Sequence, residues 1–151
     1  MIKFARSRLR NGLLIGRLLP VYVLLGLAKH LVALRRLVRW VWCSPVGPRN
    51  REAERRLAAG VARLSQLTGM RDRDCLQRSL LLYRVLSRAG AEPTLVVGFQ
   101  RLDSQIIGHA WVVVDGQAVV EPDADIVRFS ATLHFGAQGA LLPGRPEARA
   151  S

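Results

Sequence analysis

The sequence predicts an α+β fold in which a mostly buried helix packs on a small antiparallel sheet. Residues 51–67 and the stretch from about Asp74 to just before Gly90 place apolar side chains at helical spacing. From Thr94 onward the pattern changes to short runs of β-branched residues separated by turn signals. A chain of 151 residues, half of them apolar, is long enough to close one sizeable core.

The positive charge is concentrated in the first half of the chain. Residues 1–74 hold 16 Lys and Arg against 4 Asp and Glu, whereas residues 75–151 hold 7 of each kind. Such a basic excess attracts nucleic acid, anionic lipid or acidic peptide without choosing among them. The charge of the N-terminal segment therefore predicts a docking role for it, and the rest of the chain is expected to be a folded domain with no net charge.

The apolar run Leu18–Ala28 is flanked by Arg17 and Lys29 and is only 11 residues long. A membrane-spanning helix needs about 20 residues, and no small-residue cleavage site follows, so we expect neither a membrane span nor a signal peptide. With two cysteines and no disulfide framework, the sequence favours a reducing, cytoplasmic location.

A breaker at residues 44–48, Ser-Pro-Val-Gly-Pro, divides the predicted chain. Residues 1–43 are expected to form one or two Arg/Leu-rich helices, residues 49–135 the main domain, and residues 136–151 a flexible tail. In the main domain, the helix near Asp74 has a capping-box pattern, with Asp74 as cap and Gln77 three residues on. The strands are expected at residues 94–100, 106–114 and 117–121.

The chemistry is expected at Cys75, in the first turn of the buried helix. Unpaired backbone N–H groups and the helix dipole favour a thiolate there, and the same groups suit an oxyanion on an attacked carbonyl. A thiolate also needs a base that can protonate the leaving amine. Of the three histidines, only His109 lies in a strongly patterned strand. Cys75 and His109 are therefore the predicted nucleophile and base, with neither a cofactor nor a metal.

Two segments carry a resemblance to a known family, Cys75-Leu76-Gln77-Arg78-Ser79-Leu80 and His109-Ala110-Trp111-Val112. Together with Gly90, Val97-Gly98 and Asp115-Gly116, they resemble the lasso-peptide leader peptidases, which are transglutaminase-like cysteine peptidases. The resemblance spans about residues 50–125, and it implies a papain/transglutaminase-like core.

The resemblance also implies a function and partners. Its substrate would be a ribosomally made precursor peptide, from which the leader is removed to free an amine for an asparagine-synthetase-like cyclase. The chain is too short to include a winged-helix domain that grips the leader, so a separate recognition protein is expected. Nucleic acid is not an expected partner, and a membrane surface is the weaker alternative for the N-terminal segment.

The family usually carries an Asp on the strand after the histidine, where this sequence has Glu121. A two-residue turn at Asp115-Gly116 would point Glu121 away from His109. A three-residue bulged loop would instead pair residue 113 with residue 117 and place Glu121 opposite His109. We expect the bulged register, with Glu121 as the acid that orients His109 and Asp123 as the substitute.

Three other residues near these motifs are assigned more loosely. Trp111 shares a strand face with His109 and either walls the site or fills the core. Arg78, one turn into the helix, contacts either substrate or an internal acid. Cys43 is expected to be structural.

Two further functions compete with peptide hydrolysis. A transglutaminase-like enzyme would form the same acyl-enzyme and pass it to an amine. A non-catalytic basic module would use the charged N-terminal segment on a membrane surface or partner, with the Cys and His incidental.

Overall fold

The computed structural model describes residues 2–68, 74–121 and 123–143, with the side chains of residues 2–13 and 123–124 outside that description. Four longer helices come first: α1 (Ile2–Leu31), α2 (Leu34–Val41), α3 (Arg51–Leu67) and α4 (Cys75–Arg88). The strands are β1 (Thr94–Leu102), β2 (Gln105–Val114), β3 (Gln117–Val119), β4 (Ser130–Phe135) and β5 (Leu141–Leu142). A short helix α5 (Asp123–Ile126) and a 3-10 turn η1 (Ala137–Gly139) lie between them.

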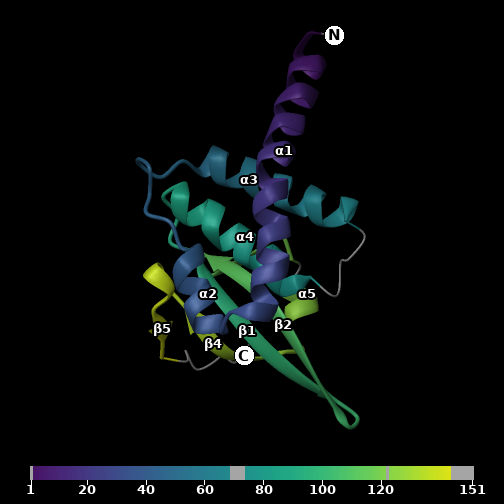
Figure 1. Cartoon of the computed structure of the whole chain (residues 1–151), viewed down its shortest axis with the longest axis vertical. Coiled ribbons are helices and arrows are strands. Elements are labelled where there is room, and N and C mark those ends of the chain that lie inside the picture. Colours follow the sequence, from purple (N-terminus) through teal and green to yellow (C-terminus); the bar gives the residue numbers. More distant parts are fainter. Residues whose placement is uncertain (1, 69–73, 122, 144–151) are drawn as a thin grey trace.

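The strands form one antiparallel sheet in the order β3-β2-β1-β4-β5. Helix α4 lies against the sheet, and α1, α2 and α3 pack on α4 (Figure 1). The predicted α+β fold with a buried helix on an antiparallel sheet is confirmed.

Helix α4 is the centre of the core because its side chains are buried on almost every side. Leu80, Leu81, Tyr83 and Leu86 are at most 1% exposed. On the sheet they face the buried strand residues Leu95, Val97, Ala110, Val112 and Val114. The helix begins at Cys75, as predicted, and ends before Gly90, whose φ of +86° is a conformation that glycine adopts without strain.

The N-terminal helices belong to the same core as α4. Leu18, Tyr22 and Leu25 of α1 and Leu37, Val38 and Val41 of α2 are buried in one cluster with the α4 side chains. At the crossing, a Cβ on Gly26 would lie 2.8 Å from the Gln77 amide, so a larger residue would displace that side chain. The breaker at residues 44–48 therefore changes the chain direction without separating two cores.

Part of α1 nevertheless stays uncovered. Figure 1 shows its N-terminal half projecting beyond the other helices. Further along, Val23, Leu24, Leu27 and Leu31 are 53–83% exposed. The window Leu14–Leu31 is long and apolar enough to cross a membrane by length and composition, properties that core helices and signal sequences share. Arg17 and Lys29, expected to interrupt this run, lie inside a continuous helix.

Beyond residue 125, where the sequence pattern weakens, the chain still adds two strands. β4 pairs with the far side of β1, and β5 pairs with β4. Residues 136–142, expected to open a flexible tail, return to the core. Tyr83 donates a hydrogen bond to the Gly136 carbonyl (2.5 Å), and the Gly139 N–H donates to the Tyr83 hydroxyl (3.1 Å). The rest of that segment, from residue 144, lies outside the described residues.

Candidate active site

The site is built on one face of α4, at the edge of the sheet. Cys75, Arg78 and Ser79 are three and four residues apart, so they share one side of the helix. Each meets a different group of the sheet or its edge. Cys75 contacts His109, Arg78 contacts Glu121, and Ser79 donates to the Ala110 carbonyl at 2.8 Å.

Asp74 precedes this face but does not cap the helix with its side chain, so the predicted capping box is wrong. Its carboxylate turns to α1 instead, where it accepts a hydrogen bond from Lys29 Nζ (2.9 Å) and one from the Tyr22 hydroxyl (3.4 Å). Gln77 donates to the Tyr22 carbonyl at 2.6 Å. The first intrahelical hydrogen bond runs from the Arg78 N–H to the Asp74 carbonyl, and among the described residues no side chain caps the N–H groups of the first turn. They are left for the thiolate and for a developing oxyanion.

Cys75 and His109 stabilise each other's charged forms. Burial opposes ionisation of Cys75, but the hydrogen bond with His109 and the N–H groups of Ala110 and Leu76 outweigh it, so its pKa lies below the usual range. The hydrogen bond with Cys75 and then that with Glu121 raise the pKa of His109 to about 9. The pair therefore favours a thiolate beside an imidazolium, the charge state that a nucleophilic cysteine uses.

Glu121 joins the histidine to Arg78. His109 Nε2 lies 2.5 Å from Glu121 Oε2, which leaves Nδ1 as the ring nitrogen available to the thiol. Arg78 donates to the other carboxylate oxygen, Oε1. Burial raises the pKa of Glu121, but the hydrogen bond with His109 and the charge of Arg78 prevail and lower it. The expected contact between His109 and Glu121 is confirmed, and Arg78 meets an internal acid.

The register through which we expected that contact is wrong. β2 and β3 are joined by the two-residue turn Asp115-Gly116, with residue 114 opposite residue 117. Both turn residues have positive φ, the requirement of a type I′ turn. Continued alternation would have pointed Glu121 away from His109. However, β3 ends at Val119, and Val120 has a φ of +76°, so the chain bends and Glu121 returns to the histidine.

The early end of β3 also frees part of β2. β3 pairs only with residues 112–114, so among the described residues the backbone of Ala110 has no strand partner on that side. Its carbonyl accepts from Ser79, and its N–H bonds the Cys75 sulfur. The N-terminus of α4 therefore occupies the place that a longer β3 would take.

Two aromatic rings, those of Phe129 and Trp111, pack against the His109 ring. His109 stacks on Phe129 with ring centroids 4.9 Å apart and on Trp111 at 6.0 Å. Trp111 is 5% exposed and packs with Val96 and Phe129 in a small cluster on the sheet face away from α4. It therefore fills a core and backs the histidine.

The substitute acid Asp123 and the second cysteine Cys43 complete the predicted residues. Asp123 begins α5, and its side chain lies outside the described part of the structure. Cys43 is half-buried and lies just after the end of α2. Sequence reasoning missed Ser79 and Lys29. A serine on the Cys75 face of an otherwise apolar helix is a signal for Ser79, whereas no local pattern connects Lys29 with Asp74, 45 residues away.

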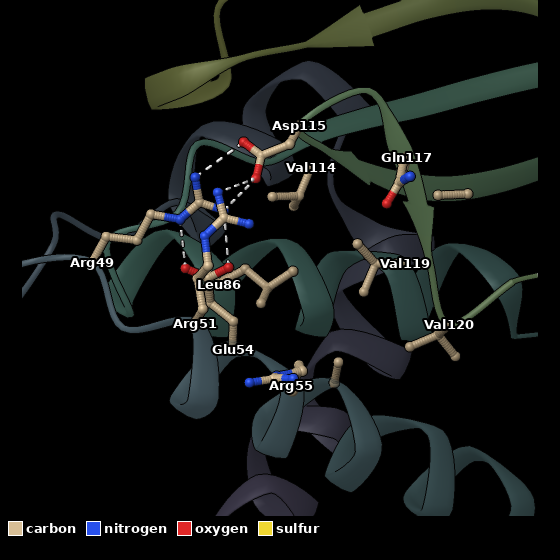
Figure 2. A pocket seen from close by; sticks show the side chains of 12 residues that line it. Arg49, Arg51, Glu54, Arg55, Leu86, Val114, Asp115, Gln117, Val119 and Val120 are labelled. Carbon is tan, nitrogen blue, oxygen red and sulfur yellow. Dashed lines mark hydrogen bonds and ion pairs between the residues drawn. The ribbon is translucent and has the colours of Figure 1, made fainter.

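A cleft of about 490 Å³ lies between α3 and the β2–β3 hairpin (Figure 2). Figure 2 shows Arg49 between Glu54 of α3 and Asp115 of the hairpin turn. Arg49 bonds both carboxylates at 2.7–3.0 Å, and Arg51 pairs with Asp115 at 3.2 Å. These ion pairs tie the hairpin to α3 and so fix the strand end that leads into Glu121.

Comparison of the sequence with protein-family models agrees with this geometry. The model of the transglutaminase-like superfamily matches residues 18–134, so the chain belongs to that superfamily. The match begins inside α1 and ends in β4, and it includes Cys75, His109 and Glu121. Neither curated proteins nor solved structures gave a match.

Proposed function

We propose that the protein is a cysteine endopeptidase that removes the leader from a ribosomally synthesised lasso-peptide precursor. The observation that carries the catalytic part is the chain of contacts from Cys75 through His109 to Glu121. Membership of the transglutaminase-like superfamily is compatible with a cysteine peptidase or an acyltransferase. The lasso-peptide part rests on the resemblance of the segments around Cys75 and His109.

In the proposed reaction, the Cys75 thiolate attacks the carbonyl carbon of the last leader residue and forms a C–S bond. The carbonyl electron pair moves to oxygen, where first-turn N–H groups of α4 can receive the oxyanion. The C–N bond then breaks as the His109 imidazolium gives its proton to the departing amine. Neutral His109 next takes a proton from water, and the resulting hydroxide attacks the thioester carbonyl. The C–S bond breaks, and the leader acid so formed loses its remaining proton to solvent. Cys75 leaves as thiolate and His109 is again imidazolium.

We propose three partners in the cytoplasm: the precursor peptide, a separate winged-helix recognition protein that binds the leader, and an asparagine-synthetase-like cyclase that uses the freed amine. The uncovered side of α1 suits a protein partner, since Leu24, Leu27 and Leu31 are exposed in a basic segment that attracts acidic chains. A lipid surface is the weaker alternative, because the same residues would enter it only if α1 lay parallel to the membrane plane.

The test is incubation with the precursor peptide encoded beside the gene, with the recognition protein present, followed by intact-mass analysis. Two fragments whose masses sum to the precursor plus one water support the peptidase. With methylamine added as an acyl acceptor, formation of the leader methylamide in preference to the leader acid would favour acyl transfer. Cys75→Ala should abolish either product and Cys43→Ala should retain it. Unchanged precursor with both wild type and Cys75→Ala would refute the proposal.

A further inference from the structure

Strand β2 continues past the active site as a free edge. β1 and β2 pair over their whole length, from residues 94 and 113 to residues 102 and 105. On the other side β2 pairs only through residues 112–114. Residues 105–108 are exposed, and Figure 1 shows this hairpin projecting away from the helices. Within the described residues, the edge therefore has no strand beside it.

The backbone groups on that edge can be placed from Ala110. Its carbonyl bonds Ser79 and its N–H bonds the Cys75 sulfur, so both point away from β1. In an antiparallel sheet the direction of these groups alternates along the strand. Gly108 and Ile106 therefore turn their N–H and carbonyl groups to the same open side. A chain that hydrogen-bonds with Ile106 and Gly108 meets the Cys75 sulfur at its next step.

Apolar side chains lie beside this edge, on the sheet face that α4 covers further along. Phe99 is opposite Gly108 in the β1–β2 register and is 41% exposed, and Ile106 is 74% exposed. A Cβ added to Gly108 would lie 3.3 Å from the Phe99 ring, so glycine leaves the ring surface open beside the edge. An apolar side chain of a bound peptide could cover both Phe99 and Ile106.

We propose that the substrate peptide binds as an added strand on the free edge of β2, with an apolar side chain on the shelf formed by Phe99, Ile106 and Gly108. The proposal rests on the peptidase function and names how its peptide substrate is held. Strand addition gives affinity through main-chain hydrogen bonds and selectivity through side-chain pockets. The occupant is a substrate because the edge runs without a break into Ala110 and His109, which contact the reacting sulfur.

Two thiol reagents separate substrate pairing from thiol reactivity. Iodoacetamide is too small to use the edge, whereas a leucine-containing tripeptide chloromethyl ketone can pair with it. A third reagent, the same tripeptide with its backbone nitrogens methylated, cannot donate those hydrogen bonds. For each, the second-order rate of Cys75 modification is measured by intact mass.

The matched variants are Ile106→Pro, which removes the edge N–H, and Ile106→Ala, which keeps it. Ile106→Pro leaves the pairing with β1 intact, because that N–H points away from β1. Relative to Ile106→Ala, it should slow the tripeptide reagent about fivefold, the value of one hydrogen bond. Phe99→Ala should slow it similarly, and iodoacetamide should react equally with all. The methylated reagent should be slow on the wild type, a result that needs no variant to fold.

The outcomes distinguish this proposal from the peptidase function itself. Equal rates for the tripeptide and its methylated form on the wild type, or equal rates for the proline and alanine variants, would overturn the added strand alone. Absence of tripeptide modification at Cys75, with iodoacetamide still reacting, would count against the peptidase. Loss of recognition-protein capture in Ile106→Pro with unchanged reagent rates would assign the edge to a partner and overturn the substrate proposal.

Discussion

Replacing Glu121 by glutamine removes one charge and keeps the size of the side chain. Glu121 raises the pKa of His109 by its hydrogen bond and its negative charge, and the histidine stands at about 9 against an ordinary value of 6.5. Without that carboxylate, the pKa of His109 should fall from about 9 toward 6.5. The imidazolium is the acid that protonates the leaving amine, so the alkaline limb of the pH–rate profile should move down with it. Replacing the orienting acid by its amide also fixes the wrong histidine tautomer, a loss worth up to about 10⁴-fold in the serine-protease triad, so turnover near neutral pH should fall by at least about 10²-fold.

The assay combines precursor cleavage with iodoacetamide alkylation of Cys75, each measured from pH 5 to 10. Alkylation reports the thiolate, which His109 stabilises, so its acid limb should move to higher pH in Glu121→Gln. Thermal melting at each pH serves as the folding control. Because the pKa of His109 is raised in the folded protein, its contribution to stability is present below about 6.5 and lost as the pH rises through about 9. A variant that is folded, with the alkaline limb of cleavage still near pH 9, would refute the role given to Glu121.

Three further predictions follow from the contacts around α4. Arg78→Met removes the cation that lowers the pKa of Glu121, so that pKa should rise and turnover should fall about tenfold, while Arg78→Lys should restore most activity; unchanged turnover in the folded methionine variant would limit Arg78 to a structural role. Lys29→Met leaves the buried Asp74 carboxylate without its cation, so the free energy of unfolding should fall by about 3 kcal/mol in urea denaturation; a loss within error would contradict the pairing. Truncation before residue 44 removes the buried side chains of α1 and α2, so circular dichroism should show no cooperative melting, and a cooperative transition would show that the remaining core is sufficient.

The sequence was informative where the signal was local. The start of α4 at Cys75 and its stop before Gly90 follow from an apolar helix pattern with a glycine after it. The β1–β2–β3 strand pattern was likewise predictable, because β-branched runs and Asp115-Gly116 mark strands and a tight turn. The apolar face of α4 could also be read directly, because nearly every position on it is buried.

The features that failed depend on contacts between distant residues. Asp74 has the right position for a cap, but Lys29 from α1 offers it a full charge, and the cap is not made. The positive φ of Val120 is unexpected for a β-branched residue, which rarely adopts it. β4 escaped notice although Ser130–Phe135 alternates polar and apolar residues, and its place beside β1 is set by the sheet.

The early end of β3 explains why this sheet carries a site at its edge. A longer β3 in the observed register would use the N–H and carbonyl groups of Ala110 for strand pairing, and the N-terminus of α4 could not approach them. Val120 ends that pairing in a conformation that costs about 1–3 kcal/mol, and such strain persists only where surrounding contacts hold it. Here Arg78 and His109 both bond the next residue, Glu121, and Arg49 holds the hairpin turn before it. The end of β3 that brings Glu121 to His109 thus also leaves the backbone of Ala110 free to contact the Cys75 sulfur. It likewise leaves the backbone groups of Gly108 and Ile106 open to the proposed substrate chain.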